Sequence, residues 1–250
     1  RFNTDGTPDE TFTSPIFSGN YDGYIRDIGQ QSDGKLIVVG HFIQIDGDNY
    51  YRIVRLNTDG SIDNTFYNGN GFNGQALVCK VLADDGILVG GTFNQYDGSG
   101  NSHLFKLNSS GDIDATFAGN ANINSHVHAI AIDGSGSIYA GGNFSNHIIK
   151  LNSDGTTDGS FDPGSGFNDR VTAIKIQNDG KLIVGGWFNE YDGSPCNSTI
   201  VRLETNGSLD ESFVSQGTGI ELWSGWLGIQ ALDIQSDGKI IAVGWFVVYN

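Results

Sequence analysis

Short apolar runs alternate with turn residues along the whole chain. Apolar and polar residues alternate in Val171–Ile176, and an almost unbroken apolar run follows in Lys181–Phe188. Alternation is typical of a half-buried strand, and a short unbroken apolar run is typical of a strand buried on both faces. Between them lies Asn178-Asp179-Gly180, a sequence that supplies the positive φ values of a tight hairpin. The pattern therefore predicts paired antiparallel strands rather than helices.

This strand pattern recurs because two motifs alternate through the sequence with a period of about fifty residues. The first motif reads Arg/Lys-Leu-Asn-x-Asp-Gly-x-x-Asp-x-Thr/Ser-Phe in its common form. Its five copies are Arg1–Phe12, Arg55–Phe66, Lys106–Phe117, Lys150–Phe161 and Arg202–Phe213. The second motif has an Asp-Gly turn followed by an apolar strand. Its copies are Ser32–Phe42, Asn178–Phe188 and Ser236–Phe246, with looser copies at Asp84–Phe93 and Gly134–Phe144.

Each repeat predicts four antiparallel strands, which is the composition of one β-propeller blade. The chain begins with strands three and four of a repeat, Arg1–Phe12, and ends with strands one and two, Ile229–Phe246. Pairing these halves would complete a fifth blade and remove two exposed sheet edges. We therefore predict an all-β, five-bladed propeller, closed into one domain over residues 1–250. The alternative is a fragment of a longer array, because the sequence does not begin with Met.

The first motif resembles the delta-60 repeat, a β-propeller repeat family, and the resemblance covers essentially the whole chain. Copies depart from the pattern at Phe2, Ser110, Glu204 and Asn206, which are turn or core positions. The resemblance implies a module of phage virion and tail proteins or of large bacterial surface and secreted proteins. It brings no catalytic residues that can be carried over to this sequence.

Composition narrows the range of partners. The chain has 13 Lys and Arg residues against 29 Asp and Glu residues, a formal net charge of −16. Such a surface repels nucleic acid and anionic lipid, so we expect neither as a partner. No apolar run approaches the length of a membrane span, so we expect no membrane insertion. The 37 glycines indicate many tight turns.

Oxygen-bearing residues in the first motif raise the question of calcium. Asn57, Asp59 and Asp63 partly match a calcium-binding loop, but the spacing and the closing Glu of an EF-hand are missing. Side-chain-capped turns explain why the motif recurs in every repeat and are the favoured interpretation. We therefore predict no cofactor and no metal site, with a weak surface calcium site as the alternative. His126 and His128 lie two apart, and no third ligand recurs beside them that would favour zinc.

The binding surface is predicted where the repeats differ. One end of every repeat carries the uniform Asp-Gly turns, while the links at the other end vary in length and are rich in aromatic residues. Variable loops on a uniform scaffold are typical of binding sites, and aromatic rings are common at interfaces. The alternative is that these rings pack onto the repeats beneath them. The candidate ligand-binding residues are Trp223, Trp226, Tyr21, Tyr24, Tyr50, Tyr51, Tyr96, Tyr191, Trp187 and Trp245.

These observations favour a non-enzymatic structural and binding module. The sequence has no nucleophile elbow, no phosphate-binding loop and no Cys-x-x-Cys motif, and no pair of carboxylates stands out by its spacing. We expect a phage tail or virion protein that recognises a host surface, with a cell-surface glycan or protein and other virion or surface-protein subunits as partners. The first alternative is a lectin-like or adhesin domain of a secreted or cell-surface bacterial protein. The second is a glycan-active hydrolase or lyase on a propeller scaffold.

Overall fold

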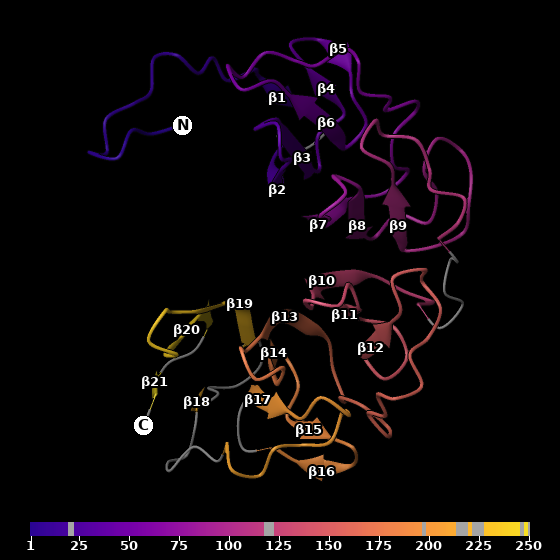
Figure 1. The fold of residues 1–250 in the computed structure, drawn as a ribbon, viewed down its shortest axis with the longest axis vertical. Helices are drawn as coiled ribbons and strands as arrows, with labels where there is room; N and C mark the ends of the chain where they lie inside the picture. The colour runs from indigo at the N-terminus through magenta and orange to yellow at the C-terminus, as the bar shows by residue number, and fades with distance from the viewer. Residues whose placement is uncertain are drawn as a thin grey trace. The chain divides into compact units, whose positions relative to one another are not determined.

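The computed structural model describes residues 1–19, 23–117, 123–196, 199–213, 220–221, 228–245 and 248–249. The chain forms two compact units, residues 1–115 and 116–250. Every regular element in the described ranges is a β-strand, which confirms the all-β prediction (Figure 1). Within these ranges no helix has the length and apolar character that a membrane crossing requires. The organisation of residues 1–250 as one domain stays a prediction.

Unit 1 contains two three-stranded antiparallel sheets, one for each repeat. The first sheet consists of β2 (Ile25–Gln30), β3 (Leu36–Gly40) and β6 (Ile53–Leu56), with β3 in the middle. The second consists of β7 (Ala76–Val81), β8 (Ile87–Gly91) and β9 (Leu104–Leu107), with β8 in the middle. A small third sheet joins β1 (Phe17–Ser18), β4 (Gln44–Ile45) and β5 (Asp48–Asn49).

Unit 2 repeats this plan. Its three-stranded sheets are β10 (Val127–Ile132), β11 (Ile138–Gly142) and β12 (Ile148–Leu151), and β13 (Val171–Ile176), β14 (Leu182–Gly186) and β17 (Ile200–Leu203). A further sheet pairs β19 (Gly228–Ile234) with β20 (Ile240–Trp245). Two short pairs join β15 (Glu190–Tyr191) to β16 (Ser194–Pro195) and β18 (Ile220–Glu221) to β21 (Val248–Tyr249). The predicted pairing of Arg1–Phe12 with the last of the large sheets stays a prediction.

The predicted fourth strand of each repeat is not formed; a single bridge takes its place. In the first complete repeat Leu56 pairs with Ile62, and the ladder ends there. The Asp63 carboxylate accepts the amide N–H of Thr65 at 2.9 Å, and the Asp63 carbonyl accepts that of Phe66 at 3.2 Å. These amides are used in a turn, so they are not available to a sheet. The corresponding bridges are Phe2–Pro8, Leu107–Ile113, Leu151–Thr157 and Leu203–Leu209.

The Asn-x-Asp-Gly segments form the capped turns that were weighed against a calcium loop. Asp59 Oδ1 accepts the amide N–H of Ser61 at 3.0 Å and its hydroxyl at 2.6 Å. Gly60 has a φ of 89°, and an added Cβ there would lie 2.3 Å from the carbonyl oxygen of Thr13. The glycine is therefore required both by the turn and by the close approach of a neighbouring segment. Asp5 and Asp154 make the same pair of bonds in their own repeats.

An ion pair within each repeat ties its third strand to the turn that follows. Arg55 Nε lies 2.8 Å and Lys35 Nζ 3.0 Å from Asp63 Oδ2, in a site where the Asp63 side chain is 6% exposed. Burial disfavours the charged carboxylate, but hydrogen bonds from Thr65 and the charges of Lys35 and Arg55 hold the pKa of Asp63 well below its usual range. The other pairs are Arg1–Asp9, Lys106–Asp114, Lys150–Asp158 and Arg202–Asp210.

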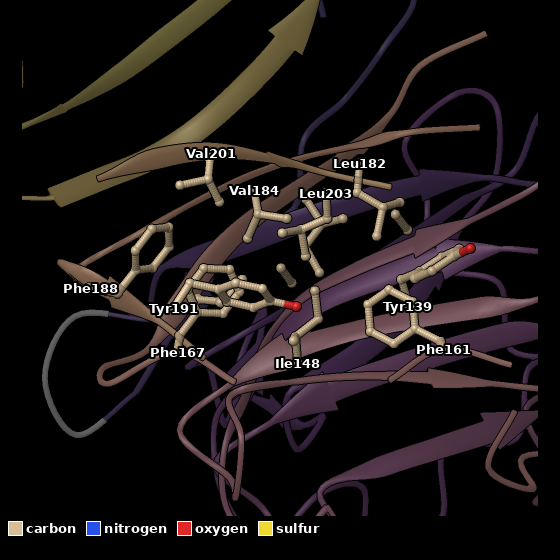
Figure 2. Close-up of a cluster of buried hydrophobic side chains, with 14 residues drawn as sticks. Tyr139, Ile148, Phe161, Phe167, Leu182, Val184, Phe188, Tyr191, Val201 and Leu203 are labelled. Carbon is tan, nitrogen blue, oxygen red and sulfur yellow. The ribbon is translucent and has the colours of Figure 1, made fainter. Parts of the chain in front are cut away.

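The best-developed core of unit 2 lies around the strands of the fourth repeat. Figure 2 shows Phe167, Phe188 and Tyr191 grouped beside the aliphatic side chains of β14 and β17. The ring centroids of Phe167 and Phe188 are 4.1 Å apart, and those of Phe167 and Tyr191 are 4.5 Å apart. Phe72, Phe93 and Tyr96 repeat this trio in unit 1. The Phe that ends the second motif is thus a core residue at positions 42, 93, 144 and 188.

Within each unit, the first strand of a repeat packs against the second strand of the repeat before it. Ile183 on β14 belongs to one buried cluster with Ile229 and Leu232 on β19. An added Cβ on Gly185 would lie 2.7 Å from Ile229 and 3.1 Å from Leu232. The missing side chain at Gly185 therefore makes room for large residues on the next strand.

Arg1–Phe12 contacts the first complete repeat as later copies of the motif contact their neighbours. The amide of Thr13 donates to the carbonyl of Asp59 at 2.8 Å. One period later the amide of Tyr67 donates to the carbonyl of Ser110 at 2.7 Å. The N-terminal copy therefore takes the position of the outer part of a repeat that precedes β2.

We expect Asp63→Asn to lower the free energy of unfolding by about 3 kcal/mol, because it leaves a buried Arg55 without its anionic partner. Urea unfolding measures this change. Asp9→Asn is the matched control, because its partner Arg1 is 45% exposed and solvent compensates the loss. An equal decrease in the free energy of unfolding of the two variants would show that burial of the ion pair does not determine its contribution to stability.

Acid should weaken the fold through these carboxylates. Lys150 and the hydroxyl and amide of Ser160 hold the pKa of Asp158 at about 2, below the value of about 3.9 expected for an unfolded chain. A carboxyl group whose pKa is lowered by folding stabilises the folded state fully at pH values above its pKa in the unfolded chain. This stabilisation is lost as the pH falls through its pKa in the folded protein. We expect the free energy of unfolding to fall between about pH 4 and pH 2, and Asp158→Asn to make that fall shallower in urea titrations.

Chelation should leave the protein intact. The Asp59 carboxylate already accepts the amide and the hydroxyl of Ser61, so the turn needs no cation. We expect the same Tm in a thermal melt with and without EDTA. A loss of many degrees that added calcium reverses would contradict the turn interpretation.

Candidate functional site

The two ends of each repeat carry different chemistry. The turn end holds the Asp-Gly hairpins and the ion pairs described above. At the other end, called the loop end here, the first strand begins and the second strand finishes. A backbone hydrogen bond joins these points: Trp187 N donates to Arg170 O at 3.0 Å, and His41 N to Tyr24 O at 2.9 Å. The same bond joins Thr92 to Gln75 and Asn143 to His126. Each repeat thus presents two neighbouring residues whose identity changes from repeat to repeat.

In the fourth repeat these two residues form a cation–aromatic pair. The guanidinium carbon of Arg170 lies 3.6 Å from the centre of the Trp187 ring, and both side chains are half-buried. An added Cβ on Gly228 would lie 2.5 Å from the edge of that ring, so Trp187 lies directly against the start of β19. Trp187 therefore has one edge in the packing between repeats and a face covered by a cation.

The first complete repeat carries a similar arrangement. The ring centroids of Tyr24 and His41 are 5.4 Å apart, and the guanidinium carbon of Arg26 lies 4.7 Å from the centre of the Tyr24 ring. Tyr24 is 40% exposed. Arg52 precedes β6 at the same end, with a φ of 72°, and donates from Nη1 to the carbonyl of Phe72 at 2.5 Å. Burial lowers the pKa of Arg52 from its ordinary value.

Three of the four Lys and Arg residues that form no ion pair within the described ranges lie at the loop end. Nine of the 13 Lys and Arg residues form ion pairs with carboxylates. Within the described ranges, Arg26, Arg52, Lys80 and Arg170 have no carboxylate at ion-pair distance. The three arginines lie at the loop end, and Lys80 lies near the far end of β7. In a chain of net charge −16, these three arginines are therefore cations to which an anionic ligand could bind.

The loop end proved more regular than its sequence suggested, because a third Asp-Gly turn recurs there. Asp46, Asp97 and Asp192 have φ values of 52°, 48° and 46°, and each is followed by a glycine with positive φ. The turns close the β4–β5 and β15–β16 hairpins and a bridge between Tyr96 and Ser99. Each carboxylate caps the link before its repeat by accepting an amide N–H at 2.9 Å, from Ile16, Asn70 and Ser165 respectively.

Tyr96 and Tyr191 lie in the core and not on the predicted binding surface. They are 0% and 3% exposed, and their hydroxyls donate to the carbonyls of Gly111, at 2.8 Å, and Gly207. Burial raises the pKa of both phenols. The alternative interpretation, that such rings pack onto the repeat beneath them, is correct for these two residues. A ring whose hydroxyl closes a core hydrogen bond has no group left for a ligand.

The remaining predicted residues divide by exposure. Trp245 is 64% exposed at the end of β20. Tyr50 and Tyr51 are half-buried, and Tyr50 packs against the core beneath β4. Trp223, Trp226 and Tyr21 lie outside the described residues.

The third repeat has the shortest link. Asn146 and His147 have φ values of 64° and 61°, so two residues reverse the chain where other repeats use a longer loop. His147 Nδ1 lies 2.9 Å from the carbonyl oxygen of Phe144, and burial lowers the pKa of His147 although Asp169 opposes the effect.

The ring centroids of His126 and His128 are 6.3 Å apart. Over the described ranges, no three His, Cys, Asp or Glu residues converge in a way that could hold a metal ion.

The fold resembles several solved propellers at low sequence identity. Virginiamycin B lyase from Staphylococcus aureus matches with a TM-score of 0.53 and 16% identity, over 92% of this chain and 73% of that one. A gluconolactonase from Xanthomonas campestris matches with a TM-score of 0.52 and 13% identity, over 97% and 74%. The WD40 β-propeller domain of Doa1 matches with a TM-score of 0.53 and 15% identity, over 94% and 80%. No curated protein matches the chain. Likenesses at this level of identity show the fold alone.

A family model matches the repeats of the sequence itself. A beta-propeller domain family of unknown function, DUF5122, matches residues 31–66, 82–117, 134–161, 177–213 and 235–250, which together make up more than half of the chain. These segments contain the turn motifs and second strands of the repeats described above. The match confirms a propeller repeat family, whereas the delta-60 assignment and the link to phage stay predictions. The chain belongs to the DUF5122 beta-propeller family, whose function is unknown.

Proposed function

We propose that this protein is a non-catalytic binding module that engages a cell-surface glycan or protein through the loop end of its repeats. The observation that carries the proposal is the Arg170–Trp187 pair, in which a guanidinium lies 3.6 Å from an indole ring centre. Tyr24 and Arg26 provide a second cation–aromatic pair at the same end of another repeat. Such a pair offers a flat apolar surface beside several N–H donors.

This chemistry suits a glycan that carries acidic groups. A sugar ring packs on an aromatic face, and the fork of a guanidinium matches the geometry of a carboxylate or sulfate. Arg26, Arg52 and Arg170 have no carboxylate partner within the described ranges, so their charge is available to a ligand. At the turn end, by contrast, Arg55, Lys150 and Arg202 are already in ion pairs with Asp residues.

The setting we propose is a phage tail or virion, where a repetitive and strongly acidic module would recognise a host surface. A lectin-like or adhesin role in a secreted bacterial protein fits the same loop-end chemistry and is the second candidate. The lyase and lactonase likenesses are likenesses of fold at 16% identity or less, so they lend no catalytic residue to this chain. Trp223 and Trp226 stay candidate contact residues alongside the Arg170–Trp187 pair.

We expect the protein to bind carboxylated or sulfated oligosaccharides on a glycan array in preference to neutral ones, more weakly at higher salt. Arg170→Ala and Trp187→Ala should each weaken binding of the best array ligand by about 1–3 kcal/mol in calorimetric titration. Both variants should keep the wild-type circular dichroism spectrum.

Lys80→Ala is the matched control, because Lys80 also lacks an ion-pair partner within the described ranges but lies near the other end of its repeat. It should bind as the wild type does. Equal losses for Lys80→Ala and Arg170→Ala would mean that overall charge, and not the loop end, governs binding. Absence of binding to every class of glycan on the array would overturn the proposed ligand.

A further inference from the structure

Histidine and lysine lie at opposite ends of the repeats. Every lysine lies at the turn end or in the half of its strand next to that end, as Lys35 and Lys181 do directly before β3 and β14. The histidines all lie at the loop end, next to the end of a strand or, for His128, second in β10. They are His41, His103, His126, His128 and His147.

This distribution makes the charge of the loop end depend on pH. The ordinary pKa of histidine is about 6.5, whereas carboxyl groups titrate near pH 4 and lysine near pH 10. At neutral pH the loop-end cations are Arg26, Arg52 and Arg170. Protonation of the histidines adds positive charge at the loop end and none at the turn end. A moderate fall in pH therefore favours anions at the loop end selectively.

The third repeat, in unit 2, holds three of the histidines. The ring centroids of His126 and His128 are 6.3 Å apart at the start of β10. Gly142 on β11 pairs with Val127 on one side and donates its N–H to the carbonyl of His147 at 3.0 Å on the other. His147 is thus two strand spacings, about 10 Å, from the start of β10. A short oligosaccharide is long enough to span these three residues.

His147 also faces the repeat that carries the Arg170–Trp187 pair. Burial lowers the pKa of His147, and the charge of Asp169, which directly precedes Arg170, opposes this effect. His147 Nδ1 lies 2.9 Å from the carbonyl oxygen of Phe144. A carbonyl only accepts, so Nδ1 carries the proton of the neutral ring and Nε2 receives the second proton. An anion bound at this end favours that second proton.

Unit 1 carries the same chemistry around His41. The Tyr24 ring has its centroid 5.4 Å from that of His41 and its centre 4.7 Å from the guanidinium carbon of Arg26. Arg52 is one strand away, with its carbonyl 3.2 Å from the amide nitrogen of the residue before His41. Asp27, next to Arg26 in sequence, accepts two backbone N–H groups at 2.9 and 3.0 Å. The setting of His41 therefore suits an acidic group of a ligand.

We infer that binding of an acidic glycan at the loop end is coupled to proton uptake by these histidines, so that the protein holds the glycan in mildly acidic surroundings and releases it at neutral pH. This inference rests on the proposed function, adds regulation to the same site, and applies to each unit by itself. An anion beside an imidazole stabilises the charged ring, and by linkage the protonated ring binds the anion more tightly. The gain is complete below the pKa of the free protein and is lost as pH rises through the higher pKa of the complex.

Calorimetric titration with a sulfated oligosaccharide tests this coupling, because sulfate groups keep their charge between pH 5 and pH 8. We expect the full chain to bind this probe about tenfold more tightly at pH 5.5 than at pH 7.5. At pH 6.5, titrations in buffers of different ionisation enthalpy should show a net uptake of protons on binding. The same oligosaccharide without sulfate should show neither effect.

Substitutions then identify the groups that take up the protons. His147→Gln, and His126→Gln together with His128→Gln, should each lower the proton uptake and the ratio of the affinities at the two pH values. A variant with Gln at all five histidine positions should bind the probe equally at both. Lys80→His is the matched control, because it adds a histidine away from the loop end, and its affinity ratio should equal that of the wild type.

The outcomes separate this inference from the proposed function. Equal affinity at both pH values, with no proton uptake by the wild-type protein, would overturn the coupling and leave glycan binding intact. Failure to bind either oligosaccharide at either pH would contradict both. An affinity ratio that persists without the histidines, or that Lys80→His increases, would show that the loop-end histidines are not the groups responsible.

Discussion

Within each unit, the first strand of a later repeat depends on the repeat before it for its burial. Ile229 and Leu232 lose their exposure to water against β14 of the preceding repeat, not within their own sheet. A two- or three-stranded sheet of this size is marginal alone, so packing between repeats supplies the stability that a single repeat lacks. This packing requires glycine at positions 141 and 185, because a side chain at either position would clash with residues of the next strand.

Many of the polar groups at the turn end bond within their own repeat. The Asp carboxylates there accept backbone and hydroxyl hydrogens two residues away, and the ion pairs join residues eight apart, as in Arg55 and Asp63. Polar groups that satisfy one another locally leave the rest of the repeat free to vary. The loop end shows that freedom, with Arg170 and Trp187 in one repeat where another has Gln75 and Thr92.

Sequence periodicity was enough to predict strands one to three, the two turn motifs and the core role of the repeated Phe. Periodicity failed for the fourth strand because the Asp63 carboxylate accepts a backbone N–H hydrogen bond within its own turn. Such a hydrogen bond leaves no trace in the pattern of apolar residues. Periodicity also placed Tyr96 and Tyr191 on the surface. The Tyr-Asp-Gly triplet common to both was the available signal, since a recurring aromatic residue beside a turn indicates packing. Arg170 was missed because a lone arginine carries no pattern.

Locally closed turns have a consequence for how such a chain changes over time. Side-chain hydrogen bonds within each copy of the first motif join residues eight to ten apart, so much of its geometry is carried within its own stretch of sequence. Duplication or loss of one such stretch alters the number of repeats without disturbing the internal bonds of the others. Only the residues facing across each junction, such as Gly185 and Ile229, must then adapt to each other.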